Sequence, residues 1–338
     1  MNSLKSFVLV SSFLLLFVQR VYSDFWVEDE LLGWANQKSF KAKVPPILGF
    51  PAFYVQLNKQ GGRDTIDWDN LRDKKKILIL GDSVCFGFGI NFEETFGELI
   101  EKKLGEYWIS LNLSVVGYST DQQLLMLERE GLKYNPDIVV FCLWVNDIPG
   151  ILDSSPLENG GRGKPVFVLE NGELVLRNVP PKSVSTFPDI YNKMFLLTYG
   201  RYALNYYLGD RYDSFFGKIK GYLYLFEDKI AQVLLFRMVL YKDVMKRYID
   251  LLKSMMRKAK NICPCEIYLI LIPDYDQALG RKPYVDKIYD MIESEISPIV
   301  GVVKVKLSPS DFFVKNLHPN AIGHRKVAEQ TYNMLKKR

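Results

Sequence analysis

The chain has 338 residues, of which 48% are hydrophobic and 25% are charged, and its net charge is +5. These values are ordinary for a globular protein with a sizeable core. The charge is mild and the lysine-rich patches are short, so composition speaks against a nucleic-acid partner and indicates a solvated surface.

The N-terminus has the pattern of an export signal. Lys5 precedes an apolar run over residues 7–18, and Val21-Tyr22-Ser23 follows with residues that a signal peptidase accepts. The apolar run is too short for a comfortable membrane span. We therefore predict a signal peptide over residues 1–23. The protein is expected to be exported, as a periplasmic or extracellular protein or one held at the membrane by an uncleaved N-terminal anchor.

The rest of the chain divides into an extension and one domain. Residues 24–74 are punctuated by Pro45-Pro46 and Gly61-Gly62, which predicts extended segments and turns packed on the core. The domain itself spans residues 75–338, with an insertion at about 150–240.

Within this domain, short apolar runs alternate with amphipathic stretches. Strands are predicted at 77–80, 113–116, 138–143, 266–272 and 302–307. Helices are predicted at 93–104, 121–132, 241–259, 285–296 and 319–336. This alternation predicts an α/β fold with a central parallel sheet covered by helices on both faces, a three-layer α/β/α arrangement.

The four cysteines are predicted to form no disulfide framework, although export would permit one. Cys85 and Cys142 are interpreted as small buried hydrophobes. Cys263 and Cys265 flank a proline, and two cysteines that close cannot easily bridge each other. The role of this second pair stays open.

Reactive groups stand where the predicted strands end. Ser83 follows the first strand, Gly117 the second and Asn146 the third, while His318 precedes the last helix. The carboxyl ends of parallel strands form the edge where ligands bind. A histidine can take the proton of a serine and make it a nucleophile. The N–H groups of Ser83 and Gly117 and the Asn146 amide could hold the resulting oxyanion.

We therefore predict Ser83 and His318 as catalytic residues, and Ser83, Gly117 and Asn146 as the oxyanion hole. No metal or organic cofactor is required for this chemistry. His324, inside the last helix, is interpreted as structural, and Asp82 and Asp147 as residues that organise turns.

These residues resemble the four sequence blocks of the SGNH hydrolases, also called GDSL-type esterases and lipases. Gly81-Asp82-Ser83 is similar to the first block, GYSTDQ at 117–122 to the second, Asn146-Asp147 to the third and HPNAIGH at 318–324 to the last. NKQGGRD at 58–64 looks like the lead-in of exported bacterial members. The resemblance implies a flavodoxin-like sheet and an exported serine ester hydrolase that acts through an acyl-enzyme.

Two positions depart from the pattern of this family. Trp144 stands where a glycine is usual, and it could shape an acyl pocket or displace Asn146. The usual aspartate before the histidine is absent, because residues 315 and 316 are lysine and asparagine. Asp311 could substitute through a different loop path. Our working hypothesis is a Ser-His dyad in which Asn316 or a backbone carbonyl holds the imidazole.

The insertion is the least informative part of the sequence. Two apolar runs at 166–170 and 173–177 flank Asn171-Gly172, which predicts a hairpin with a type I′ turn. Residues 190–236 are rich in Tyr, Phe and Leu and are predicted to be helical. They could form a lid or an acyl-chain groove, or an accessory helical pair packed on the main domain.

Two alternatives to ester hydrolysis remain. The same site could transfer an acyl group to or from an envelope polysaccharide, with a sugar hydroxyl in place of water. The missing carboxylate could instead mark a non-catalytic scaffold that binds a glycan or a partner. The expected partner in the main hypothesis is an acyl ester of a small molecule, glycan or lipid.

Overall fold

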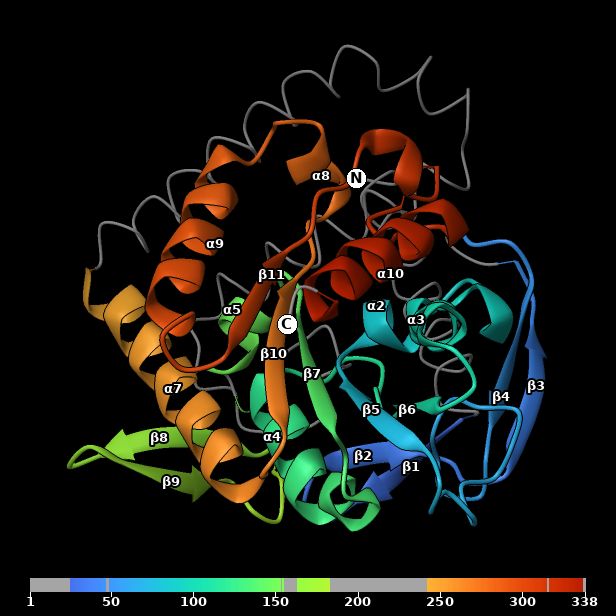
Figure 1. Cartoon of the computed structure of the whole chain (residues 1–338). Helices are drawn as coiled ribbons and strands as arrows, with labels where there is room; N and C mark the ends of the chain where they lie inside the picture. The colour runs from blue at the N-terminus through green and yellow to red at the C-terminus, as the bar shows by residue number, and fades with distance from the viewer. Residues whose placement is uncertain are drawn as a thin grey trace, which may run out of the picture.

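The computed structural model describes residues 25–46, 49–152, 154, 163–182, 242–314 and 316–336. At its centre, five parallel strands lie in the order β11-β10-β7-β5-β6 (Figure 1). Their bounds are Lys75–Leu80 (β5), Trp108–Asn112 (β6), Ile138–Leu143 (β7), Glu266–Leu271 (β10) and Gly301–Lys304 (β11). The first of these strands in the chain lies between the second and the third. This flavodoxin-like order places a topological switch point between β5 and β7.

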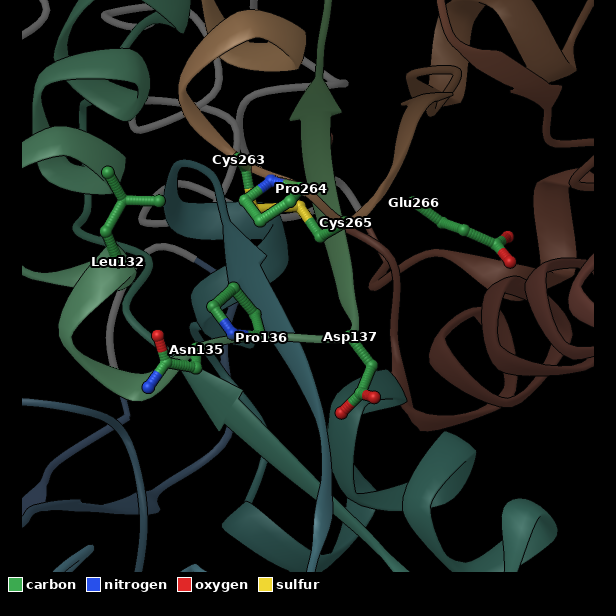
Figure 2. A pocket seen from close by; sticks show the side chains of 8 residues that line it. All are labelled: Leu132, Asn135, Pro136, Asp137, Cys263, Pro264, Cys265 and Glu266. Atoms are coloured by element: carbon green, nitrogen blue, oxygen red, sulfur yellow. A yellow bond between two sulfur atoms is a disulfide. The ribbon is translucent and has the colours of Figure 1, made fainter.

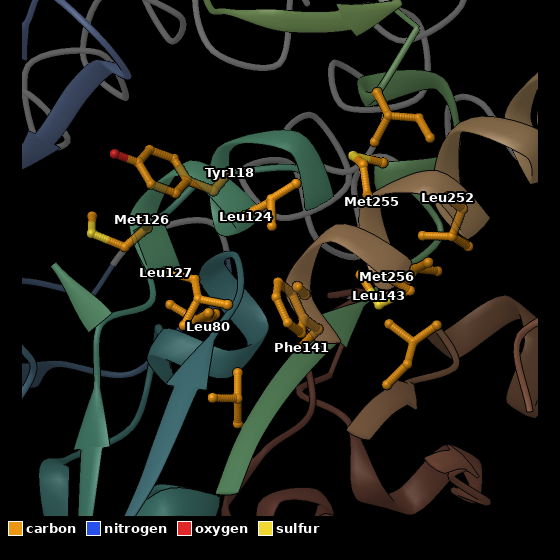
Figure 3. Close-up of a cluster of buried hydrophobic side chains, with 14 of the residues drawn as sticks. Leu80, Tyr118, Leu124, Met126, Leu127, Phe141, Leu143, Leu252, Met255 and Met256 are labelled. Carbon is orange, nitrogen blue, oxygen red and sulfur yellow. The ribbon is translucent and has the colours of Figure 1, made fainter. Parts of the chain in front are cut away.

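Helices cover both faces of the sheet (Figure 1). They are α3 (Phe96–Leu104) and α10 (Ala321–Leu335) on one face, and α4 (Thr120–Arg129), α7 (Lys242–Ile262) and α9 (Pro283–Ile296) on the other. Side chains along β7 alternate between the two cores, with Phe141 on the side of α4 and α7 and Val140 on the side of α3 and α10. Figure 3 shows part of the first core, where Phe141 lies among leucines and methionines from α4 and α7. The predicted three-layer α/β/α fold is confirmed.

The predicted strand at 113–116 is wrong, because β6 lies five residues earlier. The predicted segment still runs beside β5: the Leu113 N–H donates to the Ile79 carbonyl (2.9 Å) and the Val115 N–H to the Gly81 carbonyl (3.0 Å). It has left the regular ladder, however, and forms the loop that leads to Gly117. An apolar run therefore marked the buried continuation of a strand rather than the strand itself.

Two predicted helices are each divided into two parts. The helix predicted at 93–104 is a 3₁₀ turn, η1 (Phe92–Glu94), followed by α3, and Thr95 caps α3. The helix predicted at 121–132 is α4 followed by the 3₁₀ turn η2 (Gly131–Tyr134). The other predicted helices and strands of the sheet agree with the structure to within a few residues.

The prediction that the cysteines form no framework is also wrong, because both pairs are disulfides. Cys85 and Cys142 have Cα atoms 6.5 Å apart, and Cys263 and Cys265 have Cα atoms 5.2 Å apart. The first bridge joins the turn after β5 to β7, its neighbour in the sheet. Strand order creates that proximity across 57 positions, and spacing along the chain does not indicate it.

The N-terminal extension consists of two antiparallel hairpins. Their strands are β1 (Trp26–Asp29), β2 (Gly33–Asn36), β3 (Phe40–Val44) and β4 (Phe53–Leu57). Phe53 and Val55 of the extension share a buried cluster with Phe86 and Phe88, which directly follow the predicted nucleophile. The extension therefore supports the candidate site from outside the sheet.

The predicted hairpin in the insertion is confirmed as β8 (Val166–Glu170) and β9 (Glu173–Arg177). Asn171 and Gly172 have φ angles of 55° and 84°, as a type I′ turn requires. Just before β8, the fully buried Lys164 forms an ion pair with Asp121 of α4.

Some predictions fall outside the described residues, namely the signal peptide at 1–23 and the helices at 190–236. Among the residues that are described, no helix combines the length and the apolar character needed to cross a membrane.

Candidate active site

The predicted nucleophile lies in a tight turn at the carboxyl end of β5. Ser83 is the first residue of the short helix α2 (Ser83–Phe86), and the Asp82 carboxylate caps this helix by accepting the Val84 N–H (2.9 Å). Gly81 is required here, because a Cβ at this position would lie 2.5 Å from the Cβ of Cys85 and 2.9 Å from that of Cys142. The turn thus presents the Ser83 hydroxyl at the switch point of the sheet.

Arg63 braces the backbone that follows the nucleophile. Its side chain is completely buried and donates to the carbonyls of Phe86 (3.1 Å), Gly87 (2.7 Å), Ile90 (2.6 Å) and Tyr54 (3.1 Å). Burial lowers the pKa of this guanidinium to about 9, so it still carries its charge at neutral pH. One side chain from the extension therefore satisfies carbonyls on both sides of the turn after α2.

His318 meets the serine from the other end of the chain. It lies between the 3₁₀ turn η4 (Pro309–Asp311) and α10, and its Nε2 is 2.8 Å from the Ser83 Oγ. The two side chains are 8% and 7% exposed. The structure therefore brings together the two residues predicted as nucleophile and base, 235 positions apart in the sequence.

Asn316 determines which imidazole nitrogen carries the proton. Its Oδ1 lies 2.9 Å from the backbone N of His318 and 2.9 Å from the imidazole Nδ1. A backbone N–H can only donate, so the atom that it contacts must be the amide oxygen. The same oxygen must then accept a hydrogen bond from Nδ1–H, which leaves the Nε2 lone pair facing the Ser83 hydroxyl. This is the tautomer that a general base needs.

Asp311 does not take the place of the missing carboxylate. Its Oδ2 accepts from the backbone N (2.7 Å) and the hydroxyl (2.8 Å) of Ser308 and pairs with Lys326 (2.6 Å). These contacts hold η4 against α10. Asn316 therefore orients the imidazole, as the working hypothesis allowed.

Two aromatic rings flank the imidazole. The centroid of the Trp144 ring is 5.2 Å from that of His318, and the Phe50 centroid is 5.1 Å away on an edge-to-face approach. The tryptophan at the position where SGNH hydrolases usually have a glycine therefore packs against the imidazole of His318. Burial lowers the pKa of His318 to about 4, so the imidazole is neutral and ready to accept a proton at neutral pH.

The remaining predicted residues lie along the same edge of the sheet. Gly117 has a φ of 83°, and its loop is fastened beside the nucleophile turn by the Val115–Gly81 hydrogen bond. Asn146 directly follows the turn at the end of β7, is half-buried, and begins the short helix α5 (Asp147–Gly150).

Asp82 connects Asn146 to the nucleophile turn. Burial raises the pKa of the Asp82 carboxyl to about 7, and hydrogen bonds from the N–H groups of Val84 and Cys85 and from the Asn146 side chain oppose this rise. Asn146 thus reaches the turn that carries Ser83. Asp147 has the turn-forming contact expected of it, because its Oδ2 accepts the Trp144 N–H (2.9 Å).

His324 lies apart from the dyad, in the first turn of α10. Its Nδ1 accepts the Phe96 N–H (3.3 Å), and the side chain is 2% exposed. Burial is the main reason that its pKa is lowered, to about 3, and it joins α10 to α3 as a neutral ring. This agrees with the structural role that the sequence suggested.

Sequence reasoning missed two supports of the site, Arg63 and the Cys85–Cys142 disulfide. Arg63 stands in the NKQGGRD lead-in, so the signal was visible without its physical meaning. Among the described residues, no three His, Cys, Asp or Glu side chains gather closely enough to hold a metal ion.

Comparisons with known proteins find loose structural likeness. No family model and no curated protein matches the chain. Solved structures that resemble it include TesA (TM-score 0.42, 13% identity, 78% of this chain and 99% of that one). Others are the lipase Lip_vut3 from a goat rumen metagenome (0.43, 14%, 77% and 97%) and the acetylxylan esterase Axe2 from Geobacillus stearothermophilus (0.39, 12%, 77% and 93%). Because all these TM-scores are below 0.5, the case for function rests on the geometry of the site.

Proposed function

We propose that this protein is a serine ester hydrolase of the SGNH type, with Ser83 as nucleophile and His318 as base. The observation that carries this proposal is the 2.8 Å contact between Ser83 Oγ and His318 Nε2. Asn316 holds the imidazole in the tautomer that makes this contact productive. An accidental contact between a buried serine and a buried histidine would not require a third side chain that fixes the histidine tautomer, as Asn316 does here.

The reaction follows from this arrangement. The Ser83 proton moves to His318 Nε2 as the hydroxyl oxygen attacks the carbonyl carbon of the ester. The N–H groups of Ser83 and Gly117 and the Asn146 amide stabilise the oxyanion. Imidazolium then gives the proton to the departing alcohol, which leaves an acyl-Ser83. Water then loses a proton to His318 as it attacks the acyl carbon. The imidazolium returns that proton to the departing Ser83 oxygen, which releases the carboxylic acid and restores the free enzyme.

The electrostatics of the base predict a slow enzyme. In a full triad, a carboxylate stabilises the imidazolium that forms during the reaction, and its replacement by an amide is costly. Here Asn316 offers only a neutral oxygen, so we assign part of that task to the Trp144 and Phe50 rings. An aromatic ring attracts a cation most strongly when water is excluded, as it is around His318.

A fluorophosphonate probe tests the proposal directly. The probe should label the folded protein at Ser83, and Ser83→Ala should lose labelling and about 10⁴-fold or more of ester hydrolysis. Ser110→Ala is the matched control, because Ser110 is equally buried (7% exposed) and lies in β6 away from the site. A folded wild-type protein that is never labelled would contradict the proposal and favour a non-catalytic scaffold.

A second experiment, on the same two proteins, separates ester hydrolysis from acyl transfer. A panel of esters from acetyl to long-chain acyl groups, run on wild type and Ser83→Ala, defines the acyl group that the site accepts. Acyl-enzyme that persists in water and turns over only with an added sugar would favour transfer to an envelope polysaccharide.

We also propose that the protein is exported. The N-terminal pattern supports this, and the two disulfides fit an oxidising compartment. The intact mass of the protein recovered outside the cytoplasm should correspond to cleavage after Ser23. A full-length mass in the membrane fraction would instead indicate the uncleaved anchor.

A further inference from the structure

A hollow lies at the opposite end of the sheet strands from the dyad. It has a volume of ≈ 450 Å³ and is lined where β7 and β10 begin (Figure 2). Its lining residues are Leu132, Asn135, Pro136, Asp137, Cys263, Pro264, Cys265 and Glu266. Since the strands are six residues long, this hollow is about 20 Å from Ser83. The proposed hydrolysis does not use it.

The disulfide in this lining differs from the one beside Ser83. Cys265 is only half-buried and follows the exposed Pro264, whereas Cys263 is 2% exposed and packs in the core under α7. Cys85 and Cys142, in contrast, are 0% and 2% exposed. Thiolates attack the disulfide sulfur that they can reach, and exposed disulfides are the labile ones.

We propose that Cys263–Cys265 is a site of thiol–disulfide exchange that takes small thiols from the hollow. A thiolate attacks the Cys265 sulfur, forms a mixed disulfide there and releases Cys263 as a thiolate. A second thiolate then attacks the sulfur of the bound thiol and releases Cys265 and a small-molecule disulfide. Two electrons pass from the two thiols to the protein, and the two cysteine thiolates take up protons.

The surroundings let the bond open without unfolding the chain. The bridge spans a single proline, so it connects no distant segments. The Cys263 N–H is bonded to the Ala259 carbonyl (3.0 Å) and the Glu266 N–H to the Asp137 carbonyl (3.0 Å), so backbone hydrogen bonds hold both flanks of the bridge. The two cysteines therefore stay close together after the bond opens. Their disulfide can form again when a small-molecule disulfide is present.

The charges of the lining indicate which thiols are accepted. The two ionisable side chains that line the hollow, apart from the cysteines, are the acidic Asp137 and Glu266. Both residues are exposed. A cationic thiol should therefore react faster than a neutral one, and a neutral thiol faster than an anionic one, in a manner that salt weakens.

The test uses the whole native protein and three thiols, cysteamine, 2-mercaptoethanol and 2-mercaptoethanesulfonate, at equal thiolate concentration. After an acid quench, maleimide labelling and mass spectrometry report each cysteine. We expect Cys263 and Cys265 to open about 100-fold faster than Cys85 and Cys142, with cysteamine the fastest reagent. If both bridges open together, and only when the protein unfolds, the proposal is overturned.

A matched pair of variants tests the direction of attack. Cys263→Ser leaves a thiol at the hollow, and Cys265→Ser leaves a thiol in the core. Cystamine should modify the first variant about 10-fold faster than the second. Equal rates, or faster reaction of Cys263, would contradict the assignment of Cys265 as the attacked sulfur. Fluorophosphonate labelling of Ser83 should be unchanged in both variants, which separates this result from the fate of the proposed hydrolase.

Discussion

The two halves of the dyad are held in very different ways. The nucleophile turn is cross-braced by the buried Arg63, by the Cys85–Cys142 disulfide and by Asn112, whose Nδ2 donates to the Cys85 carbonyl (2.9 Å). The base is held by one amide and two aromatic rings. Rigidity is thus concentrated at Ser83, whereas the side chain that orients the His318 imidazole carries no charge. Changes near the serine should cost stability, and changes near the histidine should alter rate and pH dependence.

The largest effect is expected from Arg63→Met, which tests whether the turn at Ser83 is the rigidly held half of the dyad. It removes the donor from four backbone carbonyls, three of which (Phe86, Gly87 and Ile90) lie at or just after the end of α2. We expect the free energy of unfolding to fall by about 3–5 kcal/mol, measured by urea denaturation. Lys41→Met, at an exposed position of β3, is the control and should change the free energy of unfolding by less than about 0.5 kcal/mol. A loss of the same small size for Arg63 would show that the brace is unimportant.

Removal of the disulfide beside Ser83 should have the next largest effect. Cys85→Ala with Cys142→Ala opens a bridge across 57 positions, for which loop entropy predicts a loss of about 4 kcal/mol. Cys263→Ala with Cys265→Ala is the control, since so short a loop is worth only about 1.5 kcal/mol. Guanidinium unfolding without reductant measures both. Equal losses from the two pairs would mean that the first bridge adds no long-range restraint.

Asn316→Asp tests the other half of the dyad, because it places a charged group beside the His318 imidazole. A carboxylate beside Nδ1 stabilises the imidazolium, so we expect kcat to rise about 10-fold. In the proposed mechanism the neutral imidazole is the base, and its pKa of about 4 predicts activity that the imidazole leaves constant down to about pH 5 and half-lost near pH 4. The variant raises this pKa, so its acid limb should move to higher pH.

A pH profile of kcat/KM for both proteins checks the shift. Asp82, whose pKa burial raises to about 7, titrates at higher pH than His318 and is present in both proteins, so the difference between the two profiles isolates the imidazole. Asp311→Asn is the matched control, because its carboxylate bonds Ser308 and Lys326 instead. A profile that moves with Asp311→Asn and not with Asn316→Asp would refute the assigned orientation.

The smallest expected effect comes from Trp144→Leu. Loss of the ring against His318 should lower kcat by about 3- to 10-fold with little change in KM, and Trp144→Phe should restore most of it. In the Asn316→Asp background the loss should shrink, because a carboxylate then supports the imidazolium. A change in KM alone would assign Trp144 to substrate binding.

How far the sequence predicted the molecule follows from which interactions are local. The strands β5, β7 and β10 could be predicted from their apolar runs, because both faces of these strands are buried. The β8–β9 turn could be predicted from Asn171-Gly172 alone. The Cys85–Cys142 bridge and the role of Arg63 depend on which strands become neighbours. The choice of Asn316 over Asp311 depends on the path of one loop. Neither kind of information is written in residue spacing.

Because Ser83 and His318 lie far apart in the sequence, they are added to the chain at different times during its synthesis. A ribosome adds Ser83 more than two hundred residues before it adds His318. A nascent or clipped chain that stops ahead of Asn316 lacks the proton acceptor altogether. In the proposed hydrolase, such a shortened chain would therefore carry out no ester hydrolysis.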